Sequence, residues 1–118
     1  SYLYAKPLRY FYSGDKTLLT ASVMGVEKNG PMELVKALAS AGPDGKKYLC
    51  ILNRGPAIAL GGIMVDGKAI AFGTSVCVES VSGDTLTATG GSLKTFAGNK
   101  TVASVSIEPF SVMTLILP

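Results

Sequence analysis

The sequence predicts an antiparallel all-β fold, a β-sandwich of roughly eight to nine short strands, and three observations lead to this prediction. Fourteen glycines and six prolines are spread along the 118 residues, which suits many short strands joined by tight turns. Segments rich in apolar and β-branched residues alternate with turn signals at the spacing of a sandwich. No alternation of strand and helix patterns occurs, which excludes a doubly wound parallel sheet. A length of 118 residues suits one domain and is too short for two, and the 47% of hydrophobic residues can fill a core, so we expect one domain over residues 1–118.

The first thirteen residues have two interpretations. Pro7 suits the first position of a short helical turn, and Gly14 would end it. The same segment also alternates, which predicts a strand, and so short a run cannot separate a period of two from a period of 3.6. The residues that share one parity are Tyr2, Tyr4, Leu8, Tyr10 and Tyr12.

The middle of the chain has clearer strand and turn signals. The strongest turns are Gly42-Pro43-Asp44-Gly45 and Asp66-Gly67, both typical of hairpins, and Asn29-Gly30-Pro31 marks another turn. Gly61-Gly62 interrupts one strand and suggests a bulge or a close backbone approach. The strands expected between these signals are residues 17–26, 32–40, 47–53, 58–65, 68–72 and 75–81.

The C-terminal third continues the pattern with shorter segments. Ser82-Gly83-Asp84 predicts a turn, and Gly90-Gly91 breaks the alternation. Glu108-Pro109 ends one strand, and a hydrophobic segment closes the chain. The strands expected here are residues 86–88, 93–96, 101–107 and 112–117.

The inventory of reactive side chains argues against covalent chemistry. The chain contains no histidine, the commonest general base and metal ligand. Its two cysteines cannot assemble a structural zinc site, and no phosphate-binding or dinucleotide-binding glycine loop occurs. Four aspartates adjoin glycines and suit turns rather than a catalytic pair: Asp15, Asp44, Asp66 and Asp84. We therefore expect a chain that is not an enzyme, with no catalytic residues, no metal site and no cofactor.

Charge and hydropathy exclude two classes of partner. The net charge is +3, but the basic residues are scattered and Lys46-Lys47 is their one adjacent pair, so we expect no nucleic acid partner. No apolar run reaches the about 18 residues that a membrane span needs, so we expect no membrane partner. Cys50 and Cys77 fall on expected strands, and burial as small apolar side chains is favoured over a disulfide. Because the chain starts at Ser1 without a signal-peptide pattern, we expect a piece of a longer protein.

The candidate binding site is the row of tyrosines near the start of the chain. On a strand these side chains would line one face, where flat aromatic rings stack on the apolar faces of sugars and phenol hydroxyls bond sugar hydroxyls. The alternative is plain packing, because tyrosine suits a half-buried strand. The candidate carbohydrate-binding residues are Tyr2, Tyr4, Tyr10 and Tyr12.

Three segments carry a resemblance to a known class of domain. Residues 4–15 are aromatic-rich and end in Gly14-Asp15 before a strand, and residues 35–54 form a strand, a turn and a strand that ends in Asn53. The tail, residues 107–117, has a Pro-Phe-Ser turn before a last hydrophobic strand. In these features the chain resembles the C-terminal accessory β-sandwich domains of barrel-type glycoside hydrolases, either arabinofuranosidase-like or heparanase/glucuronidase-like.

The resemblance implies a function without implying catalytic residues. The catalytic glutamates of those enzymes lie in the barrel, so none of them carries over to this chain. The implied role is a secreted, extracellular, non-catalytic module that supports a covalently linked glycosidase catalytic domain, acts as a carbohydrate-binding module for a plant-type polysaccharide (β-glucan, xylan or arabinan), or does both. The alternative is an adhesion or protein-interaction β-sandwich with no role in sugar binding.

Overall fold

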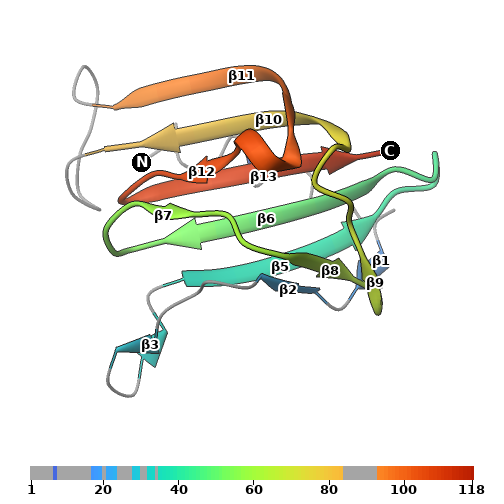
Figure 1. Ribbon diagram of the computed structural model, residues 1–118, viewed down its shortest axis with the longest axis horizontal. Helices are drawn as coiled ribbons and strands as arrows, with labels where there is room; N and C mark the ends of the chain where they lie inside the picture. Colours follow the sequence, from blue (N-terminus) through green and yellow to red (C-terminus); the bar gives the residue numbers. More distant parts are fainter. Residues whose placement is uncertain are drawn as a thin grey trace.

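The fold was analysed in a computed structural model of the chain (Figure 1). The structure describes residues 7, 17–19, 21–23, 28–29, 32–33, 35–83 and 93–118. Every paired strand in these ranges is antiparallel, which confirms the predicted all-β antiparallel class.

A six-stranded sheet forms the main layer. Its last strand in sequence, β13, lies between β6 and β10, near the middle of the sheet. This position explains why β13 is buried at nearly every residue and apolar at five of its seven residues, since both faces of a central strand are covered. In spatial order the strands are β1 (Thr17–Leu19), β5 (Val35–Ala41), β6 (Lys47–Asn53), β13 (Ser111–Leu117), β10 (Ser75–Ser82) and β11 (Lys94–Thr101).

Shorter strands and the 3₁₀ turn η3 lie beside the main sheet. Figure 1 shows several of them in front of the main sheet. They are the pair β7 (Ile58–Ala59) and β12 (Ser106–Ile107), the sheet of β2 (Ala21–Val23), β8 (Ile63–Val65) and β9 (Lys68–Ala69), the pair β3 (Lys28–Asn29) and β4 (Met32–Glu33), and the turn η3 (Val102–Ser104).

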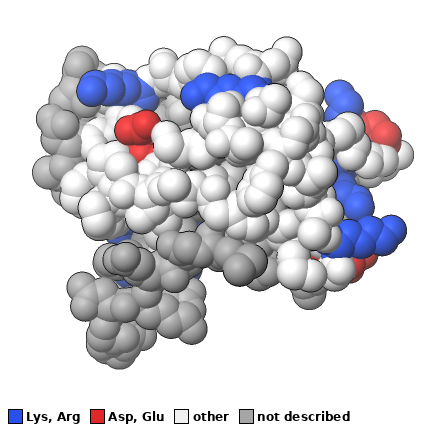
Figure 2. All heavy atoms as spheres, in the orientation of Figure 1, with Lys and Arg blue, Asp and Glu red and all other residues white. Residues whose placement is uncertain are grey.

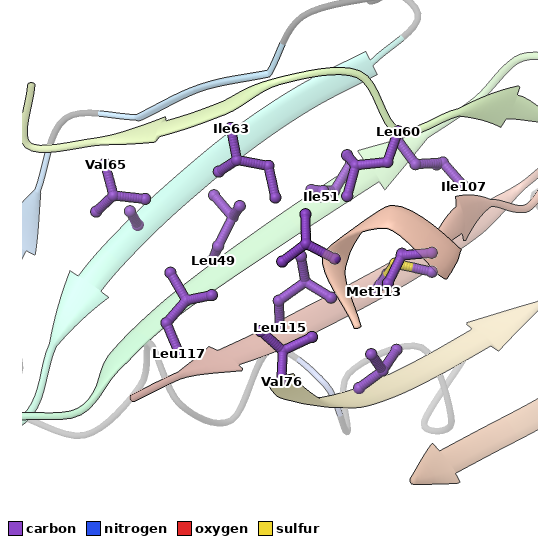
Figure 3. Close-up of a cluster of buried hydrophobic side chains, with 14 of the residues drawn as sticks. Leu49, Ile51, Leu60, Ile63, Val65, Val76, Ile107, Met113, Leu115 and Leu117 are labelled. Atoms are coloured by element: carbon purple, nitrogen blue, oxygen red, sulfur yellow. The ribbon is translucent and has the colours of Figure 1, made fainter. Parts of the chain in front are cut away.

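The hydrophobic core lies between the main sheet and these shorter elements (Figure 3). From the main sheet, Leu49, Ile51 and Leu115 point into it, all fully buried. From the opposite side, Ile63 and Ile107 meet them. The alternation along β6 and β13 is what places every second side chain in this core.

The other face of the main sheet is buried at the pair of strands β6 and β13. Cys50 and Thr114 are paired across β6 and β13 on this face, and both are completely buried. The Thr114 hydroxyl donates a 2.6 Å hydrogen bond to the carbonyl oxygen of Pro7, which is itself buried. Pro7 therefore lies against this face, and the other residues of the segment 1–13, with its strand-or-helix alternative, lie outside the described residues.

Both predicted hairpin turns are confirmed, with the backbone that their residues favour. The amide of Lys46 donates a 3.0 Å hydrogen bond to the Asp44 carboxylate, and Gly45 has a φ of 81°. Asp66 and Gly67 have φ values of 54° and 78°, so both central residues of the second turn are left-handed. This turn suits the right-handed twist of its two strands.

Several expected strands are divided or moved in the structure. The expected strand over residues 58–65 becomes β7 and β8, separated by the Gly61-Gly62 break. The prediction of a strand over residues 101–107 is wrong for its centre, because η3 occupies Val102–Ser104. Its two ends are in strands, since Thr101 is the last residue of β11 and Ser106–Ile107 forms β12. The strand before η3 is longer than expected and runs to Thr101. The short strand expected at residues 86–88 lies outside the described residues.

Candidate functional site

The four tyrosines of the predicted sugar-binding row lie outside the described residues. The structure therefore does not place Tyr2, Tyr4, Tyr10 or Tyr12. A different candidate site is present beside β11, built from residues that the sequence analysis did not select.

This site, which we call the β11 hollow, is a half-open cavity of about 320 Å³. Its described lining comes from β10, β11 and β13 of the main sheet and from the segment of residues 105–108. Its apolar floor consists of Val78, Val105 and Met113, all buried. The remaining lining residues are Ser80 and Ser82 of β10, Lys94, Thr95, Phe96 and Lys100 of β11, and Ser106 and Glu108 next to them.

An exposed aromatic ring is the main apolar surface of the hollow. Phe96 is 41% exposed although it lies in a sheet strand. Its ring lies over Gly98, and the Lys100 ammonium sits 4.6 Å from the ring centroid. A cation at this distance is attracted to the ring quadrupole. Phe96 and Lys100, which together we call the binding platform, therefore lie on a single strand.

Polar groups surround this ring. Figure 2 shows two basic side chains over β11 and an acidic one below them on the same face. The β11 lysines are Lys94 and Lys100, and Glu108 is the one carboxylate among the lining residues that the structure describes. Ser106 donates a 3.5 Å hydrogen bond to the Glu108 carboxylate, and two further serine hydroxyls come from β10. The described lining thus offers amines, hydroxyls and the Glu108 carboxylate around an aromatic surface.

Glu108 is held in place through its main chain by a buried asparagine. The Asn53 side-chain amide donates to the carbonyl oxygens of Glu108 and Pro56, both at 2.9 Å, and its oxygen accepts from the Gly55 amide at 2.8 Å. Ser111 adds a 2.7 Å hydrogen bond to the same Glu108 carbonyl. The end of β6 and the start of β13 are therefore joined beside the hollow.

The two cysteines are free thiols, as favoured from the sequence. Cys50 lies on β6 and Cys77 on β10, with β13 between them. Two strand spacings amount to about 9.5 Å, which exceeds the about 7 Å over which a disulfide can form. A disulfide between them would require a different sheet order.

The buried Cys50 thiol makes stability depend on pH in the alkaline range. Burial raises the pKa of Cys50 from 9.0 to about 11, and the Thr114 hydroxyl beside it offsets only part of that rise. A pKa raised on folding contributes stability that is complete below the unfolded pKa and is lost as pH rises through the folded pKa. We expect this thiol to lower the free energy of unfolding by roughly 2–3 kcal/mol between pH 9 and pH 11.

Urea unfolding at a series of pH values measures this loss. The Cys50→Ala variant carries no thiol at this position, so its stability should fall less over the same interval. An identical pH dependence in the variant and the natural chain would contradict the assignment.

Neither a metal site nor a membrane-spanning helix occurs in the part of the chain that the structure describes. Within it, no group of three or more histidine, cysteine, aspartate or glutamate side chains is placed to hold a metal ion. Among the same residues, no helix has the length and apolar character needed to cross a membrane.

The described residues thus define an antiparallel all-β protein with an aromatic and basic hollow at one end of its main sheet. Comparisons with protein-family models, curated proteins and solved structures found no match to this chain.

One sequence signal could have pointed to the hollow. Period-two spacing along β11 places a group of residues on one face, and this group combines two cations, a ring and a residue without a side chain. The signal was missed because the expected strand stopped at residue 96. The residues of this face are Lys94, Phe96, Gly98 and Lys100.

Proposed function

We propose that this chain is a non-catalytic module of a carbohydrate-active enzyme that binds a polysaccharide in the β11 hollow. The observation that carries the proposal is the exposed Phe96 ring inside a cavity lined by hydroxyls and amines. A sugar ring has an apolar face of C–H groups and a rim of hydroxyls, so it needs both kinds of surface. Binding sites of this type combine an apolar wall with a few polar groups that fix the orientation of the ligand.

The lining supplies a partner for each part of a sugar. The Phe96 ring offers a flat surface for the apolar face. Serine hydroxyls can both donate and accept hydrogen bonds, Lys94 and Lys100 donate, and Glu108 accepts. The half-open shape lets a polymer enter and leave along the surface.

The composition of the hollow also supports a role without catalysis. Glycoside hydrolysis generally needs two carboxyl groups that flank the scissile bond. Among the described residues that line the hollow Glu108 is the one carboxylate, and we propose that a covalently linked catalytic domain carries out bond cleavage. Two segments that carry the resemblance to glycosidase accessory domains are neighbours, because β6 and β13 pair and Asn53 bonds the Glu108 carbonyl. Because its ligand would be an extracellular polymer, we propose that the protein is secreted.

Affinity electrophoresis through gels containing β-glucan, xylan or arabinan tests this proposal. We expect at least one polysaccharide to retard the natural chain. Phe96→Ala should raise the dissociation constant about tenfold, since a lost stacking surface is worth about 1 kcal/mol or more. Phe72→Ala is the matched control, because Phe72 is 55% exposed and lies outside the hollow.

The possible results separate the two candidate sites. Loss of retardation in Phe96→Ala but not in Phe72→Ala supports the β11 hollow. If Phe96→Ala is still retarded and a variant with alanine at Tyr2, Tyr4, Tyr10 and Tyr12 is not, the binding site is the tyrosine row. Absence of retardation on every polysaccharide would overturn the sugar-binding function.

The second candidate function is adhesion or protein interaction, and the position of β11 favours it. Among the described strands β11 forms an edge of the main sheet, and it is eight residues long and mostly exposed. Such an edge can accept a strand from another protein. The lysines near both ends of β11 count against this function, since charged side chains on an edge discourage strand addition.

A further inference from the structure

Gly98 lies in the middle of β11, where the backbone does not require a glycine. Among the described glycines, Gly45 and Gly67 adopt the left-handed conformation that favours this residue, and Gly98 does not. A glycine inside a strand weakens it, because it has more freedom to lose and no side chain to pack. Its presence in an eight-residue strand therefore needs another reason.

The Phe96 ring provides that reason. A Cβ atom added to Gly98 would lie 3.1 Å from the Cζ atom of the ring and 3.6 Å from Cε1. At 3.1 Å the ring would have to move by a few tenths of an ångström for a methyl group, since carbon atoms pack at about 3.5–4.0 Å. On the same face of the strand, the Lys100 ammonium lies 4.6 Å from the ring centroid. The ring thus occupies space that a side chain at position 98 would fill.

We infer that Gly98 is a positioning residue for the binding platform, an inference that rests on the proposed sugar-binding function. Because Gly98 has no side chain, the Phe96 ring can lie close to the backbone of β11. In this position the ring leaves the β11 hollow open. Because 41% of Phe96 is exposed, the ring can move away without disrupting the core. A side chain at position 98 therefore changes ligand binding and leaves the fold intact.

Gly98→Val tests this inference through two readouts that move in different directions. Valine has a high strand propensity, so we expect the midpoint of urea unfolding to stay constant or rise. We expect binding of the polysaccharide that most retards the natural chain to weaken, with a dissociation constant about tenfold higher. The matched control is Ala97→Val, since Ala97 is the adjacent exposed residue, pairs with Glu79 and faces the other side of the sheet. The control should bind like the natural chain.

The position of the ring can be followed without a ligand. In NMR spectra of chain labelled at phenylalanine, the Phe96 resonances, assigned with Phe96→Leu, should move in Gly98→Val and stay in Ala97→Val. Gly98→Ala, which adds one methyl group, should move them in the same direction and serves if the valine variant does not fold. Unmoved Phe96 resonances in both Gly98 variants would overturn the inference.

The results also distinguish this inference from the proposed function. If Phe96→Ala abolishes retardation and Gly98→Val binds normally, Gly98 has no positioning role and the proposed function stands. If a polysaccharide retards the natural chain and Phe96→Ala binds normally, the ring is not the platform and both fail. If no polysaccharide retards the natural chain, the proposed function fails, and with it the role of Gly98 in binding.

Discussion

Replacing Asn53 with aspartate is expected to lower the free energy of unfolding by about 3–5 kcal/mol, the cost of leaving a buried charge without a partner. Asn53 is 1% exposed, and its amide nitrogen donates to the carbonyl oxygens of Pro56 and Glu108. Aspartate has nearly the same shape but would direct a carboxylate oxygen at those two acceptors. Urea unfolding at neutral pH measures the effect.

The same variant should show a pH dependence that identifies the cause. The surrounding carbonyls disfavour the carboxylate, so the pKa of the new side chain should be raised in the folded state. Its protonated form can donate one of the lost hydrogen bonds. The deficit should therefore be smallest at acid pH and grow as pH rises through the folded pKa.

Asn99→Asp is the matched control, because Asn99 is an exposed residue of β11. It should change stability by less than about 0.5 kcal/mol, as surface substitutions usually do. A deficit below about 1 kcal/mol in Asn53→Asp would mean that water replaces the hydrogen bonds, and that Asn53 does not fix the wall of the hollow.

The features that were predictable from the sequence depend on neighbouring residues. The Asp66-Gly67 turn is determined by two residues that tolerate a positive φ. The alternation of β6 is equally local, and the burial of Leu49 and Ile51 follows from it. For this reason the all-β antiparallel class and the main hairpins were correctly predicted.

The features that were missed depend on which distant segments meet. Residues 101–107 are rich in valine and isoleucine, so their local pattern favours a strand. In the structure the Val102 and Ala103 amides instead donate to the carbonyl oxygens of Thr74 and Phe72, which lie before β10. Propensity alone cannot anticipate hydrogen bonds to a segment about thirty residues away, so the η3 turn was not predicted.

The same limitation explains the candidate site. Phe96 is one of four phenylalanines, and nothing local separates it from the others. It becomes prominent because β11 pairs only with β10 among the described strands, and because its side chain stays 41% exposed beside the hollow. A cluster of four tyrosines is obvious in the sequence, whereas a cavity between β10, β11 and β12 requires the sheet order.

The core of the main sheet should be sensitive to a single truncation at Leu115. This side chain is completely buried, and its strand β13 lies between β6 and β10, so neighbours surround it on several sides. A central strand has little freedom to collapse into the space left behind. We therefore expect Leu115→Ala to cost about 2–5 kcal/mol, a transfer cost plus a cavity cost, measured by urea or thermal unfolding.

Leu38→Ala separates this cavity effect from a general effect of removing leucine. Leu38 belongs to the same sheet, on β5, but it is 49% exposed and leaves no enclosed space when shortened. We expect it to cost less than about 1 kcal/mol, because much of the removed surface already faces water. Domains of this size are stable by only about 5–15 kcal/mol, so Leu115→Ala should consume a large share of that total. Similar losses of unfolding free energy in the two variants would mean that β13 is not enclosed on both faces. The buried floor of the β11 hollow includes Met113 of the same strand, so this result would also contradict the hollow as described.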